Sequence, residues 1–129
     1  MLDLKKRLQI KNPVKPLILN LPLELKDISG QFPVKASAEP GKSHDFIMLF
    51  ATSLAEAQKG IRKLINTVTE DGMFWFCYPK QSSKKYKSDI NRDKSWALFE
   101  EYNYRPVTLI SLDENWSAMR FRDKKFVGK

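Results

Sequence analysis

The sequence is poor in residues that several kinds of functional site require. Its 129 residues include one cysteine, one histidine and five glycines. One cysteine cannot form an intramolecular disulfide, and one cysteine with one histidine leaves almost nothing for a zinc site. Residues 79–88 have neither the glycines of a P-loop nor its Gly-Lys-Ser/Thr order. We therefore expect no metal site, and no P-loop at residues 79–88.

Long apolar stretches are also missing. The longest apolar run, residues 73–78, is far shorter than a membrane span, and the charged N-terminus is not followed by an apolar signal core. We expect a soluble, cytoplasmic protein that makes no membrane contact. Its composition, 42% hydrophobic and 29% charged, suits one globular domain over residues 1–129. Basic, flexible ends are expected at about residues 1–6 and 123–129.

The charge of the chain is strongly positive and unevenly distributed. Lysine and arginine number 23 against 15 acidic residues, a formal net charge of +8. Residues 1–16, 80–94 and 117–129 each carry a net charge of +4, so the rest of the chain is net negative. Basic clusters attract anions and nucleic acid, although basic termini also serve as solubilising tails. An anionic small molecule or a nucleic acid is therefore the expected partner.

The most apolar segments predict buried strands separated by a helix. Residues 46–50 and 73–78 are apolar at every position, which is typical of strands covered on both faces. Trp75, inside the second segment, should be buried. Between the strands, Ser53 and Glu56 fit a capping box, followed by apolar residues at helical spacing. This pattern predicts a helix of about four turns that packs on the sheet.

The N-terminal part of the chain carries weaker signals. Residues 17–19 read as a short buried strand, followed by a turn. Pro22 suits the first position of a helix, and the apolar residues after it predict one short helix that ends before Gly30. Residues 33–38 are a further, weaker strand candidate.

The C-terminal part predicts a helix and a hairpin. Ser88 is a plausible N-cap, and Asp89 suits the positive end of the dipole of a helix that runs to about residue 102. Residues 106–112 and 116–122 flank an acidic turn and predict an antiparallel hairpin.

The alternation of strands and helices predicts the fold class. We expect an α/β, three-layer Rossmann-like sandwich with a mostly parallel sheet, right-handed crossovers and a C-terminal antiparallel hairpin at the edge. Ligands of such sheets bind outside the carboxyl ends of the strands. Residues 20–24, 51–53 and 79–88 should converge there, with residues 39–43 as a further candidate.

Five segments of the sequence occur in the same order as similar segments of one protein family. They are residues 7–11, 17–22, 45–52, 71–83 and 112–121. Together they resemble a family of small bacterial proteins classed as a domain of unknown function, DUF3052, in which a Trp-Pro-Lys-Lys-Ser-Ser-like loop and an Asp-Glu-x-Trp-Ser ending recur. Here the loop reads Tyr-Pro-Lys-Gln-Ser-Ser and so departs at two positions. The resemblance implies a bacterial source and a fold, and it transfers no catalytic residue.

The predicted order of elements also resembles the later part of class I methyltransferases. Dinucleotide and S-adenosylmethionine sites need glycines after the first strand, so that the backbone can approach the ligand. Leu21 and Pro22 stand there, and Pro22 has no amide to donate. Glu39 falls near the usual position of a ribose-binding acid, but on its own we interpret it as a loop carboxylate. We therefore expect no cofactor, and in particular no S-adenosylmethionine or NAD bound in the usual Rossmann mode.

The segment over residues 79–88 is the sharpest candidate site. Its hydroxyls, ammonium groups and the amides of the following helix N-terminus could surround an anion. The alternative is a flexible, solvated loop whose lysines only keep the protein soluble. The candidate anion ligands are Lys80, Ser82, Ser83, Lys84, Ser88 and Arg92.

The residue types of nucleophilic catalysis are present but badly placed. His44 precedes a strand and so lies at the amino edge of the predicted sheet, whereas Ser82 and Ser83 lie at the carboxyl edge. A Ser-His-Asp triad needs hydrogen-bond contact between such groups. Cys77 lies inside a buried strand, where a thiol is usually inert. We assign no catalytic residue, although Ser82 with a neighbouring lysine as base is conceivable.

Three functions follow from these features. The first is a non-enzymatic domain that binds an anionic ligand or macromolecule through residues 80–92. The second is an enzyme on a small phosphorylated or nucleotide-like substrate that uses Lys80 and the two neighbouring serines. The third is nucleic-acid binding by all three basic clusters, which would make affinity fall steeply with salt.

Overall fold

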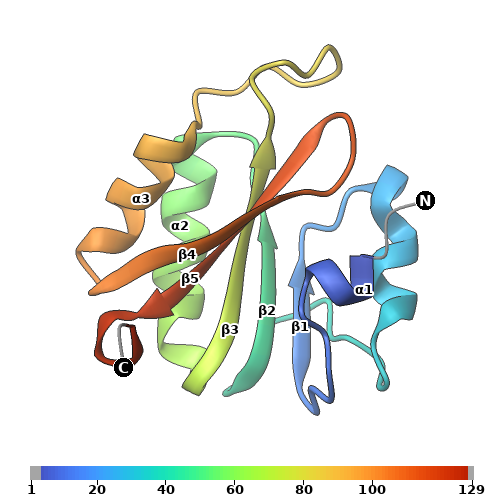
Figure 1. The fold of residues 1–129 in the computed structure, drawn as a ribbon, viewed down its shortest axis with the longest axis vertical. Helices are drawn as coiled ribbons and strands as arrows, with labels where there is room; N and C mark the ends of the chain where they lie inside the picture. Colours follow the sequence, from blue (N-terminus) through green and yellow to red (C-terminus); the bar gives the residue numbers. More distant parts are fainter. Residues whose placement is uncertain (1–3, 128–129) are drawn as a thin grey trace.

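The computed structural model describes residues 4–127 and contains one sheet with helical segments on both faces (Figure 1). The strands are β1 (Pro16–Leu19), β2 (His44–Phe50), β3 (Val68–Pro79), β4 (Tyr104–Ser111) and β5 (Trp116–Asp123). The α-helices are α1 (Leu4–Arg7), α2 (Leu54–Leu64) and α3 (Arg92–Glu100). Shorter 3₁₀ segments are η1 (Leu23–Gln31), η2 (Ile65–Thr67) and η3 (Lys124–Phe126).

The sheet is mixed, with the strand order β1-β2-β3-β5-β4. The pairings β1–β2 and β2–β3 are parallel, whereas β3–β5 and β5–β4 are antiparallel. The α/β class is as predicted, but the expectation of a mostly parallel sheet is corrected. The sheet is not mostly parallel because the C-terminal hairpin places β5 between β3 and β4, which makes half of the strand pairings antiparallel.

Alternate residues of the central strands build two cores, one on each face of the sheet. Ile47 and Leu49 of β2 face α2 and α3, whereas Met48 faces α1 and η1. This division follows from the two-residue period of a strand. Trp75 is fully buried, as predicted, and its indole nitrogen donates a hydrogen bond to the backbone oxygen of Leu8 at 3.1 Å.

Helix α2 begins where the sequence pattern places it. The hydroxyl of Ser53 accepts a hydrogen bond from the amide of Glu56, and the Glu56 carboxylate accepts one from the amide of Thr52. This arrangement satisfies amides that a helix start leaves unpaired. Further along, a Cβ atom on Gly60 would lie 2.9 Å from the side chain of Leu49, so α2 sits very close to β2.

Helix α3 starts later than the sequence pattern indicates. The side chain of Asn91, not Ser88, caps it by accepting a hydrogen bond from the amide of Lys94 at 2.8 Å. The Ser88 hydroxyl instead accepts from the amide two residues further on. Asp89 also lies outside α3, because its carboxylate accepts a hydrogen bond from the amide of Leu54 at 2.8 Å. The predicted helix start is therefore corrected: residues 88–90 dock the loop onto the start of α2.

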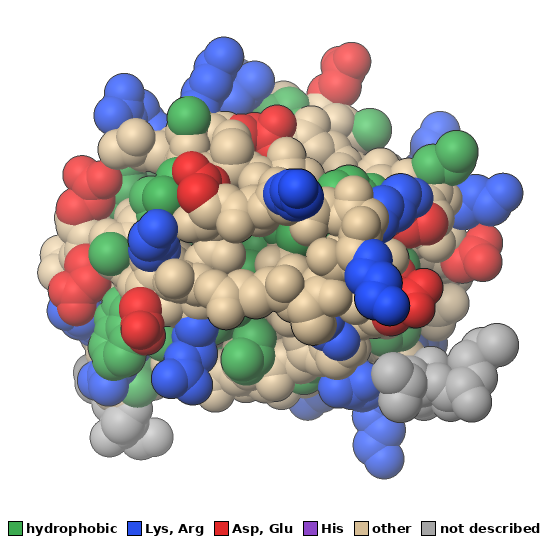
Figure 2. All heavy atoms as spheres, turned by 90° about the horizontal axis from the view of Figure 1, so that it is seen from above, with side chains coloured by type: hydrophobic (Ala, Val, Ile, Leu, Met, Phe, Trp, Pro, Cys, Tyr) green, Lys and Arg blue, Asp and Glu red, His purple; other side chains and the backbone are tan. Residues whose placement is uncertain are grey.

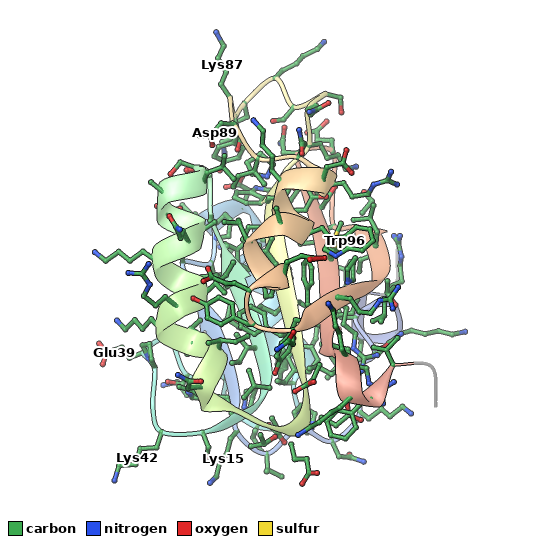
Figure 3. All side chains as sticks on the ribbon, turned by 90° about the vertical axis from the view of Figure 1, so that its left-hand side faces the viewer. Lys15, Glu39, Lys42, Lys87, Asp89 and Trp96 are labelled. Atoms are coloured by element: carbon green, nitrogen blue, oxygen red, sulfur yellow. The ribbon has the colours of Figure 1, made fainter. Side chains whose placement is uncertain are left out.

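The connection from β1 to β2 contains no full strand. The strand predicted over residues 33–38 reduces to a single parallel bridge between Leu17 and Ser37. The Ser37 hydroxyl then bonds with the backbone of Glu39, which turns the chain. Glu39 lies far from the loop that follows β3 (Figure 3). The expectation that residues 39–43 reach the carboxyl edge is therefore corrected.

His44 lies at the amino edge of the sheet, at the start of β2, and is 5% exposed. Its ring bonds with the amide of Gly41 and the backbone oxygen of Lys15. The flexible ends predicted for residues 1–6 and 123–129 lie partly outside the described residues. Within residues 4–127, no helix is long and apolar enough to cross a membrane.

Candidate functional site

The carboxyl edge of the sheet holds a crevice between β1 and β2. The chain leaves β1 over the face covered by η1 and leaves β2 over the face covered by α2, so the two connections diverge. Ligand crevices of α/β sheets form at such points. The side-chain amide of Asn20 spans the gap and donates to the backbone oxygen of Phe50 at 3.3 Å. The crevice has a volume of about 280 Å³, and its lining residues are Asn20, Pro22, Phe50, Ala51, Thr52, Glu56, Tyr86 and Trp116.

Two aromatic side chains of this crevice are tied to one carboxylate. The Tyr86 hydroxyl donates to Glu24 Oε2 at 2.6 Å, and the Trp116 indole nitrogen donates to the same oxygen at 3.2 Å. The two rings meet edge to face with centroids 4.9 Å apart. The ammonium group of Lys85 lies 3.3 Å from the other oxygen of Glu24. The loop after β3 is thus fixed to η1 across the crevice.

This arrangement shifts two acid–base equilibria in opposite directions. The hydrogen bond from Tyr86 lowers the pKa of Glu24 to about 2, because it stabilises the charged carboxylate. Desolvation, followed by the hydrogen bond to Glu24, raises the pKa of Tyr86 to about 12. At neutral pH the pair therefore consists of an ionised carboxylate and a protonated phenol.

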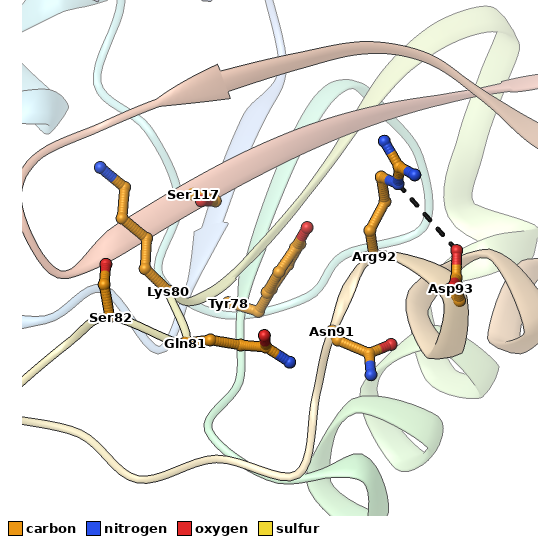
Figure 4. Close-up of a pocket in the computed structure, with 8 residues that line it drawn as sticks. All are labelled: Tyr78, Lys80, Gln81, Ser82, Asn91, Arg92, Asp93 and Ser117. Carbon is orange, nitrogen blue, oxygen red and sulfur yellow. Dashed lines mark ion pairs between the residues drawn. The ribbon is translucent and has the colours of Figure 1, made fainter.

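A second and larger groove lies at the same edge, between the loop after β3 and the start of α3. It has a volume of about 570 Å³. In Figure 4, Lys80 and Arg92 stand on either side of the Tyr78 ring, one from each element. The lining residues are Tyr78, Lys80, Gln81, Ser82, Asn91, Arg92, Asp93 and Ser117.

Three of the six predicted anion ligands line this groove, namely Lys80, Ser82 and Arg92. The other three lie outside its lining. The Ser83 hydroxyl donates to the side chain of Asn115 at 2.7 Å and accepts from two amides of its own loop. It therefore shapes the loop. Ser88 bonds locally, and Lys84 is an exposed residue of the loop.

The groove carries two cationic side chains and one carboxylate. Lys80 Nζ donates to the Ser111 hydroxyl at 2.5 Å, which holds the ammonium group beside the hairpin. Arg92 Nε lies 4.0 Å from Asp93 Oδ1, with side chains 71% and 89% exposed. An ion pair this long and this exposed contributes little, so the guanidinium is available to an incoming anion. Burial raises the pKa of Tyr78, so its phenol remains a hydrogen-bond donor at neutral pH.

Sequence reasoning missed several residues of this groove. Asn91 could have been recognised, since asparagine is as good an N-cap as serine. Ser117 could not, because it reaches the groove by pairing with Tyr78 across β3 and β5, 39 positions away along the chain. Strand pairings at such separation leave no local signal.

Other candidate chemistry is not assembled at this edge. In the described part of the chain, no three histidine, cysteine or acidic side chains are grouped to hold a metal ion. Cys77 is fully buried, and burial raises the pKa of its thiol. His44 begins β2 and Ser82 follows the end of β3, which runs parallel to β2. The two side chains therefore belong to opposite edges of the sheet, as predicted.

The β1–β2 crevice does not fit a dinucleotide or S-adenosylmethionine in the usual mode. Asn20 adopts a left-handed φ of 63°, the turn conformation that glycine usually provides, but Pro22 follows and offers no amide. Glu39 does not line the crevice. At about 280 Å³, its volume lies below the roughly 300–1,000 Å³ typical of ligand sites. The Tyr86 and Trp116 rings form part of its walls.

Comparison with known proteins identifies the fold. No protein-family model matches the chain, so the resemblance to the DUF3052 proteins is not supported, and no curated protein matches its sequence. Among solved structures, it is similar to the N-methyltransferase NodS from Bradyrhizobium japonicum WM9, with a TM-score of 0.64 and 11% identity over 93% of this chain and 91% of that chain. NodS in complex with S-adenosyl-L-homocysteine matches with a TM-score of 0.62 and 11% identity, over 93% and 83% of the two chains. LepI in complex with SAM matches with a TM-score of 0.51 and 11% identity, over 92% of this chain and 38% of that chain.

These similarities establish a methyltransferase-like α/β fold. They also correct the first functional interpretation, a non-enzymatic anion-binding domain. The overturning finding is that nearly the whole chain shares its fold with an N-methyltransferase, which is an enzyme. The sequence favoured a non-enzymatic domain because Leu21 and Pro22 stand where such folds usually have glycines, and because no catalytic motif could be assigned.

Proposed function

We propose that the protein is an enzyme that acts on a small phosphorylated or nucleotide-like substrate at the carboxyl edge of its sheet. The observation that carries the proposal is the groove of about 570 Å³ with Lys80 and Arg92 on either side of Tyr78. Its volume lies within the usual range of small-molecule sites. Its position agrees with the edge at which α/β enzymes bind their ligands.

The groove residues have distinct parts in this proposal. Lys80 and Arg92 hold the anionic group by charge, and the hydroxyls of Ser82 and Ser117 add neutral hydrogen bonds. The first turn of α3 adds backbone amides and the positive end of its dipole. Cations fixed on two sides of a reacting anionic group stabilise charge that develops in a transition state.

The carboxylate of Asp93 should weaken the binding of an anionic substrate in this groove. It is the one carboxylate that lines the groove within the described residues, and it lies next to Arg92. Replacing it with asparagine removes a like charge from the neighbourhood of a bound anion. Asp93→Asn should therefore tighten the binding of phosphate compounds.

Methyl transfer is the second candidate function, favoured by the fold and by the activity of NodS. S-Adenosyl-L-homocysteine bound to NodS is a nucleoside, and the β1–β2 crevice of this chain lies at the edge where nucleotides bind in such folds. The residues present do not fit that ligand in the usual mode. A methyl-transfer function therefore requires another binding mode or displacement of Tyr86 and Trp116.

A small substrate is favoured over nucleic acid by the distribution of charge. Lys15 and Lys87, from two of the basic clusters, lie at opposite ends of the molecule (Figure 3). Around the carboxyl edge, lysine and arginine side chains stand among acidic ones (Figure 2). A continuous basic path is what a nucleic-acid backbone requires. Nucleic-acid binding stays an untested alternative.

The proposal is tested by turnover of a substrate panel. The full chain is incubated with nucleotides and small phosphate esters, and the mixture is followed by ³¹P NMR. We expect at least one compound to be consumed, and consumption to be lost in the double variant Lys80→Ala, Arg92→Ala. Lys84→Ala, an exposed lysine of the same loop outside the groove, is the matched control. Turnover that persists in the double variant, or no turnover of any compound, would contradict the proposal.

A further inference from the structure

An apolar groove lies between α3 and β4, next to the candidate site. Its volume is about 420 Å³. Its lining residues are Arg92, Asp93, Trp96, Pro106, Val107, Thr108, Leu109 and Met119. Trp96 belongs to α3, whereas residues 106–109 belong to β4 and Met119 to β5. The floor and walls therefore come from three elements.

Three exposed large hydrophobic side chains line this groove. Trp96 is 40% exposed, Val107 39% and Leu109 48%. Among the described residues, these are three of only six large hydrophobic side chains with that degree of exposure. Apolar residues that cluster on a surface, beside polar ones, mark a place where another molecule binds. Trp75 and Trp116 are buried in the core, whereas Trp96 lies at the surface of α3.

The apolar groove is continuous with the candidate site. Arg92 and Asp93 line both grooves. They form the first turn of α3, and Trp96 follows Arg92 by four residues, so the two side chains lie on the same side of the helix. A molecule whose charged group contacts Lys80 and Arg92 therefore has the apolar groove beside it. Beyond these two shared residues, the first groove adds Lys80 and polar side chains, whereas the second adds mainly apolar ones.

We propose that the substrate is a small amphipathic phosphate monoester. Its phosphate lies between Lys80 and Arg92, and its apolar portion lies along Trp96, Val107 and Leu109. This inference rests on the proposed function and specifies its substrate class. The continuity of the two grooves through Arg92 and Asp93 selects a single ligand with two unlike ends, rather than a separate partner for the apolar groove.

A series of alkyl phosphates tests this inference. The full chain is titrated with inorganic phosphate and with ethyl, butyl and hexyl phosphate, by calorimetry below the concentration at which these compounds form micelles. We expect the affinity to rise by about twofold to fourfold for each methylene group, as for apolar groups that are partly or fully buried. Lys80→Ala should weaken every member by a similar factor, because it removes a contact to the shared phosphate.

Two variants isolate the apolar groove. Leu109→Ser and Val107→Ser each shorten the apolar wall at an exposed position, so the fold should persist. Each should reduce the dependence of affinity on chain length and leave inorganic phosphate binding unchanged. Leu23→Ser is the matched control, because Leu23 is 81% exposed and lines neither groove.

The outcomes separate this inference from the proposed function. If inorganic phosphate binds and the affinity is flat across the series, the amphipathic substrate is wrong and the proposed function stands. If inorganic phosphate shows no binding that depends on Lys80 and Arg92, the proposed function fails. The inference also fails if sedimentation shows a dimer that Leu109→Ser dissociates, because a second copy of the chain would then cover the apolar groove.

Discussion

The Glu24 carboxylate accepts a hydrogen bond from the Tyr86 hydroxyl at 2.6 Å, across 62 positions of the chain. Glu24 lies in η1, after β1, and Tyr86 lies in the loop after β3. The contact joins the loop after β3 to η1, and Trp116 donates a hydrogen bond to the same carboxylate. Tyr86 and Trp116 thereby form part of the lining of the β1–β2 crevice, which at about 280 Å³ is smaller than the groove of about 570 Å³ beside α3.

The Glu24–Tyr86 contact predicts a pH dependence of stability. The pKa of Glu24 is about 2 in the folded protein and 4.5 for an ordinary glutamate. A folded-state pKa below the unfolded value gives stability that is present above about pH 4.5 and is lost as the pH falls toward 2. Glu24→Gln removes this contribution. In urea unfolding, the stability difference between wild type and Glu24→Gln should be larger at about pH 7 than at about pH 2.5.

The Glu24–Tyr86 contact also predicts a loss of stability at alkaline pH. The pKa of Tyr86 is raised to about 12 from 10.0, so its neutral form is favoured in the folded protein. This contribution is present below about pH 10 and declines as the pH rises toward 12. Tyr86→Phe should remove that alkaline decline. A stability difference for Glu24→Gln that is the same at both acidic and neutral pH would contradict the role given to the pair.

The helix cap at Asn91 provides a test of the loop conformation. Its side chain accepts a hydrogen bond from the amide of Lys94. Loss of an N-cap side chain lowers the free energy of unfolding by about 0.5–2 kcal/mol. Asn91→Ala should therefore destabilise the protein within that range. Ser88→Ala should cost less, because the Ser88 hydroxyl makes only a local turn contact. The reverse order of the two losses, measured by chemical denaturation, would place the start of α3 at Ser88 after all.

The small volume of the β1–β2 crevice predicts weak binding of nucleoside cofactors. Wild-type protein titrated with S-adenosyl-L-homocysteine should bind it with a dissociation constant no tighter than about 1 mM. The reason is that the crevice, lined by Tyr86 and Trp116, holds only about 280 Å³ and that Pro22 offers no amide. Micromolar affinity, with NMR shifts centred on residues 20–24, would favour methyl transfer over the proposed function.

Local sequence signals predicted the elements whose contacts are local. The capping box at Ser53 and Glu56 involves neighbouring residues only, and it is present. Residues 46–50 and 74–78 are apolar throughout because helices cover both faces of β2 and β3, and they are buried in the structure. Such features can be recognised without knowledge of the rest of the chain.

Features set by distant partners could not be predicted in this way. Asp89 has the pattern of a first-turn residue of α3. In the structure its carboxylate instead accepts a hydrogen bond from the amide of Leu54, and α3 begins only at Arg92. The insertion of β5 between β3 and β4 depends on pairings such as Trp75 with Arg120, which no local pattern specifies. The groove beside α3 could not be predicted for the same reason, because Ser117 reaches it through the pairing of β3 with β5.

Binding of inorganic phosphate tests the central claim most directly. Phosphate is titrated into the full chain and followed through backbone amide NMR shifts. Each exposed charge or helix-dipole contact contributes about 0.3–1 kcal/mol, so the dissociation constant should be in the millimolar range. We expect shifts at residues 78–82, 91–93 and 117 that are lost in the double variant Lys80→Ala, Arg92→Ala and kept in Lys84→Ala. Shifts spread evenly over the basic termini, or unchanged in the double variant, would contradict it.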